Sequence, residues 1–306
     1  MKKIIFYCLF LALPFMLLTQ CSPKTGWQKK NDELIRQYEL TSRKLNVPKT
    51  KIISNLEPGT VINLNTTADV ALYPEVNAKL YWGTGTMTGI LQLEPNAHIP
   101  EEILPADRFL FVLEGEVSQL VEGSNVKMIA VKREEQDGTH NITPRIDFIY
   151  LEKGSNNALT AGPAGAKVIE IYSPVRLDYL QKAGINDVPA KNVDLRTHAT
   201  PNVKPNKVYD LYEFQLTELT EGAHSRLITG KNAQISFISM EPGSFFKHHI
   251  HPEEQTMLVL RGGCDEILLD GEQAMAKDDV VLIPGNMVHG AIVGEFGCDA
   301  IDIFWP

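Results

Sequence analysis

Three histidines near the carboxyl end of the chain have the spacing of a metal site. His249 and His251 are two residues apart, so on a strand both imidazoles would point to the same side. Gln255 follows four residues later, and His289 comes from a later predicted strand. Imidazole nitrogens and an amide oxygen are suitable ligands for a divalent cation. We therefore expect His249, His251, Gln255 and His289 to hold one divalent ion, and these ligands allow Mn, Zn, Ni or Fe.

The predicted ligands are neutral, so a bound dication would keep its full charge. Such an ion acts as a Lewis acid and favours an anionic partner. Lys247 lies on the same predicted face as His249 and His251, and we expect it to face the cavity as a catalytic or anion-binding group. His248 belongs to the opposite face and is expected to be solvated. The pattern predicts a small anionic molecule as the ligand of this site.

The elements that position these residues come from an internal duplication. Residues 93–115 and 240–262 align without a gap at an offset of 147 residues, and 169–174 matches 301–306 at an offset of 132. The difference between the two offsets falls in the polar segment 132–146, which is predicted to be a surface loop. The chain is therefore predicted to hold two copies of one domain.

Each copy has the pattern of short strands separated by turn residues. Such spacing predicts an all-β sandwich or barrel. Helical patterns are confined to about residues 32–45 and 177–182, and a proline-containing stretch is expected to link the copies. The predicted units are a signal peptide (1–20), an anchor segment with a short helix (21–56), a first domain (57–183), a linker (184–207) and a second domain (208–306).

The histidine pattern resembles the two sequence motifs of the cupins. Gly243 is followed by five residues, His249-x-His251 and Gln255, and Pro284 to His289 resembles the second motif. Gln255 stands where many cupins have glutamate, and Asn286 where they have glycine, which should change only a turn. The resemblance implies two tandem double-stranded β-helix (jelly-roll) barrels.

The first copy lacks the equivalent ligands. At the two offsets, the four ligand positions correspond to Glu102, Leu104, Arg108 and Asn157. A leucine cannot ligate, and an arginine repels a cation. Glu102 and Arg108 are expected to pair in the former cavity, so only the second copy should bind metal.

Two enzyme families share further features with the chain. The ligand pattern looks like that of the small cupins that convert 4,5-unsaturated uronates into linear ketouronates in pectin and alginate breakdown. These also carry an acid in an Asp-x-Phe-x-Pro pattern, which Asp302 to Pro306 fits. The resemblance implies that Asp302 faces the cavity and transfers protons, although a role in orienting a ligand stays open.

The two-domain arrangement instead resembles ureidoglycine aminohydrolases, which are bicupins with a vestigial first domain. Their ligand types differ at the positions of His249, Gln255 and His289. A binding protein without turnover is a third alternative, because cupin folds host many functions. A metal-dependent enzyme acting on sugar acids is the prediction that we favour.

The amino terminus predicts export. Lys2 and Lys3 precede an apolar stretch, 4–18, that is too short to span a membrane and is typical of a secretory signal. The residues before Cys21 resemble a bacterial lipobox, which implies a lipidated cysteine and a periplasm-facing membrane anchor.

The composition limits the remaining partners. With 38 acidic and 29 basic residues the net charge is −9, which argues against nucleic-acid binding. Cys264 and Cys298 would lie in a compartment that permits a disulfide, and both the disulfide and two buried thiols stay open. A homo-oligomer also stays open.

Overall fold

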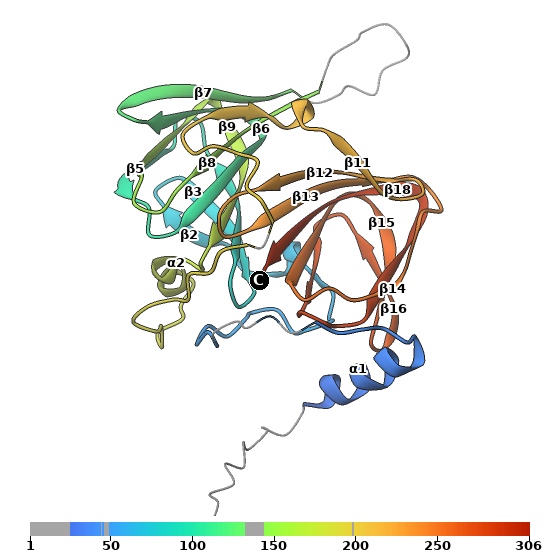
Figure 1. Cartoon of the computed structure of the whole chain (residues 1–306). Helices are drawn as coiled ribbons and strands as arrows, with labels where there is room; N and C mark the ends of the chain where they lie inside the picture. Colours follow the sequence, from blue (N-terminus) through green and yellow to red (C-terminus); the bar gives the residue numbers. More distant parts are fainter. Residues whose placement is uncertain (1–24, 44, 46–48, 132–143, 198) are drawn as a thin grey trace, which may run out of the picture.

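The computed structural model describes residues 25–43, 45, 49–131, 144–197 and 199–306. The predicted signal peptide, Cys21 and most of the loop 132–146 lie outside the described residues. The described chain forms two β-barrels that pack side by side (Figure 1). Within these residues, no helix combines the length and apolar character needed to cross a membrane. The all-β prediction of two tandem barrels is confirmed.

The first barrel is built around two long strands, β6 and β9, that pair along most of their length. The strand order is β10-β8-β7-β6-β9-β4-β3-β2, and β5 pairs with β9. Its own strands are β2 (Val70–Tyr73), β3 (Val76–Trp82), β4 (Met87–Leu93), β5 (His98–Ile103), β6 (Asp107–Val121), β7 (Ser124–Val131), β8 (Arg145–Leu151) and β9 (Asn156–Ser173).

The second barrel repeats this arrangement strand for strand. The strand order is β1-β17-β15-β18-β13-β12-β11, with β14 on β18 and β16 on β15. Its own strands are β11 (Leu216–Thr220), β12 (Ala223–Thr229), β13 (Gln234–Met240), β14 (Phe245–His249), β15 (Glu254–Leu268), β16 (Gly271–Ala276), β17 (Asp279–Ile283) and β18 (His289–Trp305). The strands β6 and β15 begin 147 residues apart, at the offset found in the sequence.

The two barrels exchange their first strands. β1 (Ile62–Asn63) pairs with β17 of the second barrel, and β10 (Val208–Asp210) pairs with β8 of the first. Each exchanged strand continues into a 3₁₀ turn, η1 (Leu64–Thr66) or η2 (Leu211–Glu213). The side chain of the last strand residue, Asn63 or Asp210, caps the start of that turn. The domain boundaries predicted at residues 57 and 208 therefore place β1 in the first domain and β10 in the second, whereas each strand pairs with the other barrel.

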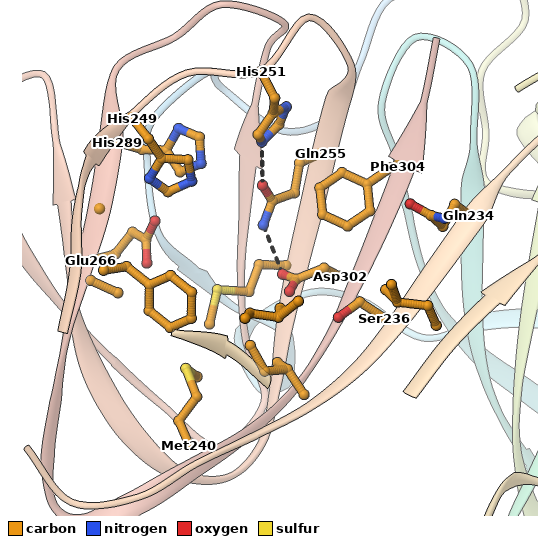
Figure 2. A pocket seen from close by; sticks show the side chains of 17 residues that line it. Gln234, Ser236, Met240, His249, His251, Gln255, Glu266, His289, Asp302 and Phe304 are labelled. Atoms are coloured by element: carbon orange, nitrogen blue, oxygen red, sulfur yellow. Dashed lines mark hydrogen bonds between the residues drawn. The ribbon is translucent and has the colours of Figure 1, made fainter. Parts of the chain in front are cut away.

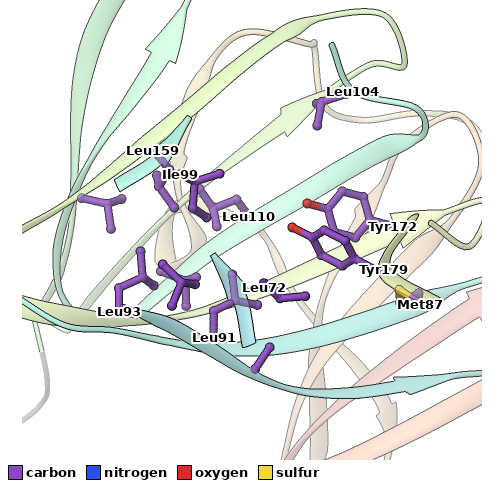
Figure 3. Packing of buried hydrophobic residues seen from close by; sticks show 14 of the residues in the cluster. Leu72, Met87, Leu91, Leu93, Ile99, Leu104, Leu110, Leu159, Tyr172 and Tyr179 are labelled. Atoms are coloured by element: carbon purple, nitrogen blue, oxygen red, sulfur yellow. The ribbon is translucent and has the colours of Figure 1, made fainter. Parts of the chain in front are cut away.

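A continuous apolar core lies between the barrels. Phe111 of β6 contacts Phe237 of β13, with ring centroids 4.7 Å apart. The exchanged strand β10 adds to this core, because its Tyr209 stacks on Phe148 of β8. Each barrel also has its own interior, and that of the first is filled by leucines, isoleucines and two tyrosines (Figure 3).

Two helices lie outside the barrels. α2 (Leu177–Lys182) lies where the sequence predicts it, whereas α1 spans Gly26–Gln37 and not 32–45. The helix begins early because the side chain of Gln28 accepts a hydrogen bond from the backbone N–H of Thr25 at 2.9 Å, which caps its first turn. α1 packs on the second barrel beside β14 and β16 (Figure 1).

Candidate metal centre

Two strand ends and a loop bring the predicted histidines together. His249 ends β14 and lies opposite His289, the first residue of β18, while His251 lies in the loop that follows β14. One ligand atom from each histidine lies within 4.8 Å of the others. Figure 2 shows the three rings at one end of a cavity inside the second barrel.

The three imidazoles are oriented through one nitrogen each. The Nδ1 atoms of His249, His251 and His289 lie 2.8, 2.9 and 2.9 Å from backbone carbonyl oxygens of Lys247, Glu253 and Met287. A carbonyl accepts, so Nδ1 must carry the proton and Nε2 keeps its lone pair. Burial lowers the pKa of His249 and, more strongly, that of His289, so both rings are neutral.

Three polar atoms indicate that this arrangement fits a cation. Nε2 of His289 is buried and has no hydrogen-bond partner. Nε2 of His251 lies 2.9 Å from Oε1 of Gln255, and both atoms are acceptors in these orientations. Two acceptors at this distance repel each other unless a metal ion or a proton on the ring lies between them. The site thus has the donor set of a divalent metal centre.

Asp302 lies beside this group. Gln255 donates a hydrogen bond from Nε2 to Oδ1 of Asp302 at 2.8 Å, and this bond leaves the amide oxygen facing His251. Burial raises the pKa of Asp302 to about 7, although the hydrogen bond from Gln255 opposes this shift. The acid is therefore near half ionisation at neutral pH, as a proton-transfer group should be.

The cavity has a volume of about 270 Å³ and a mostly apolar wall. This is at the small end of the range for ligand pockets, so the cavity suits a small molecule. Its residues are Leu219, Leu227, Gln234, Ser236, Ile238, Met240, Phe246, His249, His251, Gln255, Met257, Glu266, His289, Gly290, Ala291, Asp302 and Phe304.

The structure does not place Lys247 in this cavity. Its side chain is exposed, and Phe246 lines the wall. The register of β14 against β18 shifts between Phe246 and His249, so strict alternation along this strand fails. His248 lies outside the cavity with a partly exposed side chain, and its ring stacks on Tyr38 at a centroid distance of 4.0 Å.

Glu266 was not predicted. This residue of β15 lines the cavity and is 2% exposed. Simple alternation places Gln255 and Glu266, eleven residues apart, on opposite faces. Irregularities between Val259 and Arg261 and between Gly262 and Cys264 change the alternation, so both side chains face inward. The glycine pair that follows Arg261 was the only sequence signal for such a bulge.

The N-terminal segment holds the loop that leads to His289. Asn31 of α1 is buried; its Nδ2 donates to the carbonyl of Asn286, and its Oδ1 accepts from the N–H of Val288, both at 2.7 Å. Asn286 adopts the left-handed conformation that its motif position requires, with φ of 63°. Its Oδ1 also accepts from the N–H of Arg43 at 2.9 Å, so it does more than replace a turn glycine.

In the first barrel an ion pair occupies the equivalent position. Arg108 is fully buried and donates to Glu170 at 2.9 Å and to Gln119 at 2.5 Å. The expected pairing of Glu102 with Arg108 is wrong, because Glu102 binds Arg176 at 2.8 Å. Position 170 corresponds to 302, so the acid that faces the metal centre in one barrel binds a guanidinium in the other.

The two remaining cysteines, Cys264 and Cys298, are buried free thiols. The hydrogen bond with the neighbouring Cys298 thiol, and then burial, raise the pKa of Cys264 far above its usual value. Both thiols belong to the interior of the second barrel.

Comparison with known proteins supports the fold and not a particular reaction. The cupin domain family matches residues 236–303, which include every predicted ligand and Asp302. The protein has the bicupin fold. A search of curated proteins found no match.

Several solved structures share the bicupin architecture at low sequence identity. AerE from Microcystis aeruginosa is 13% identical with a TM-score of 0.56, covering 78% of this chain and 96% of its own. A cupin 2 conserved barrel domain protein from Leptotrichia buccalis is 16% identical with a TM-score of 0.52, and the match covers 83% of this chain and 100% of that protein. Oxalate decarboxylase from Bacillus subtilis is 14% identical with a TM-score of 0.56, and the match covers 83% of this chain and 77% of that protein.

Proposed function

We propose that this bicupin is a metal-dependent enzyme that acts on a small anionic molecule, with unsaturated uronates or related sugar acids as the substrate class. One observation carries the proposal: the Nε2 atoms of three histidines and Oε1 of Gln255 converge beside the buried acid Asp302 in one cavity.

The site residues have two roles in this proposal: some bind the metal ion and one transfers a proton. His249, His251, Gln255 and His289 would hold the ion, which supplies Lewis acidity toward an anionic oxygen when bound. Asp302 keeps one carboxyl oxygen on Gln255 and leaves the other to hold or move a proton of the substrate. The mostly apolar wall lowers the local dielectric constant around it, which strengthens these electrostatic interactions.

The cavity wall supplies no cationic side chain among its described residues, since Lys247 is exposed. An anionic substrate would therefore depend on the metal ion for charge neutralisation. This favours a ligand with a single carboxylate or enolate group over a highly charged one.

A substrate panel with metal-loaded protein tests the proposal. A uronate-converting enzyme would remove the ultraviolet absorbance of the unsaturated sugar acid, whereas an aminohydrolase would release ammonia from ureidoglycine. A binding protein would show only a rise in Tm with its ligand. Turnover that is equal in metal-free protein and in Asp302→Asn would contradict the catalytic proposal and favour the binding protein.

We further propose that the protein is lipid-anchored at Cys21 in the bacterial cell envelope and faces the periplasm. The charged start and the apolar stretch that ends shortly before Cys21 support this placement. Mass spectrometry should find acyl chains on Cys21, and Cys21→Ser should move the protein to the soluble fraction. An unmodified mature Cys21 in membrane-bound protein would contradict the anchor.

A further inference from the structure

Glu266 is a buried acid whose environment gives it no partner. Its carboxyl group makes no hydrogen bond or ion pair with the described part of the chain. Figure 2 shows the carboxyl group in the cavity that His249, His289 and Asp302 also line. Burial raises the pKa of Glu266 well above its usual value. An unpaired buried carboxyl group destabilises a fold, so its presence calls for a ligand.

The first barrel shows what a side chain at this position can reach. Gln119 is the counterpart of Glu266 at the offset of 147 residues. Its Oε1 accepts from Arg108 at 2.5 Å, and its Nε2 donates to Asn157 at 3.1 Å. These two partners occupy the positions of metal-ligand candidates in the second barrel.

That correspondence applies directly to the candidate metal centre. Arg108 is the counterpart of Gln255, and Asn157 is the counterpart of His289. A side chain at the position of Glu266 therefore extends to the centre of the barrel, where the ligands converge.

The charges of the two barrels follow the same correspondence. In the first barrel the central cation is the single charge of Arg108, and one carboxylate, Glu170, faces it. In the second barrel two carboxyl groups, Glu266 and Asp302, face the centre. The second barrel thus has one more acid than the first at its centre, which suits a cation of higher charge than a guanidinium.

We propose that Glu266 is the carboxylate ligand of the ion held by the three histidines. The inference rests on the proposed metal-dependent function and adds an anionic ligand to the otherwise neutral donor set. With one carboxylate bound, a divalent ion keeps one positive charge, which suits a singly charged oxygen of the substrate.

Titration of metal-free protein with Co²⁺, followed by calorimetry and visible absorption, tests this assignment. Glu266→Gln keeps the size of the side chain but cannot become anionic. We expect its Kd for Co²⁺ to rise about 10–100-fold and its absorption spectrum to change. Asp302→Asn, the matched loss of the other cavity acid, should change the Kd less, and Glu266→Asp should recover part of the affinity.

Thermal melting shows whether Glu266 serves as a metal ligand or only stabilises the fold. Metal-free Glu266→Gln should melt no lower than the wild type, because the variant removes a buried acid without a partner, while its rise in Tm with Co²⁺ should be smaller. Wild-type affinity and spectrum in Glu266→Gln would overturn the assignment and leave the metal site intact. Failure of the wild type to bind Co²⁺ would overturn the assignment together with the proposed function.

Discussion

At the residue scale, the spacing of the histidines predicts their convergence, whereas strand alternation fails for Lys247 and Glu266. His249, His251 and His289 converge as their spacing predicts, and Asp302 faces the same cavity. Glu266 could not be placed in this way, because the bulge that turns it inward depends on pairing between β15 and β18.

Replacement of Asp302 tests the proton-transfer role. Asp302→Asn keeps the hydrogen-bonding shape beside Gln255 but removes the group that can exchange a proton. We expect kcat with the substrate found in the panel to fall about 10²–10⁴-fold, and the metal content to stay near that of the wild type. Asp299→Asn is the matched control on β18, since Asp299 binds Arg261 and Ser239 away from the cavity. Wild-type kcat in Asp302→Asn would restrict this acid to a structural role.

At the scale of elements, helix α1 belongs functionally to the second barrel. The sequence predicts a helix near the anchor, but its contacts with residues about 255 positions away depend on the folded barrel. Through Asn31 the helix fixes the loop before His289, and through Tyr38 it covers His248 next to His249.

Loss of the Asn31 side chain should therefore loosen the metal centre. Asn31→Ala leaves a buried N–H and a carbonyl unpaired, which should lower the free energy of unfolding by about 1–3 kcal/mol. The affinity for metal should fall as well, because the loop before His289 is less well fixed. Lys30→Ala on the same helix removes an exposed ion pair with Asp270 and should change stability by at most about 1 kcal/mol. Denaturant unfolding and metal titration of both variants check this; equal effects would contradict the role of Asn31.

At the scale of the whole molecule, the duplication was predictable and the strand exchange was not. The repeat offset in the sequence is the same whether β1 and β10 pair with strands of their own barrel or with strands of the other barrel. Only the pairing of β1 with β17 and of β10 with β8 shows the exchange. Because each sheet contains a strand from the other half, we expect the two barrels to unfold together.

A substitution at the shared core tests this coupling. Phe237→Ala removes the ring that contacts Phe111 of the first barrel and should lower the free energy of unfolding by about 3–5 kcal/mol. Calorimetry should show one transition in the wild type and a single, lower one in the variant. Leu219→Ala, at an exposed residue of β11, should change little. Two separate transitions in the wild type would show that the barrels unfold independently.

The metal content of the purified protein tests the central claim most directly. Elemental analysis after metal repletion should find about one divalent ion per chain in the wild type, the expected stoichiometry of a single ligand set. The double variant His249→Ala/His289→Ala should contain almost none, because two of the three converging imidazoles are lost. Near-zero metal in the wild type, or equal metal in the double variant, would contradict the account.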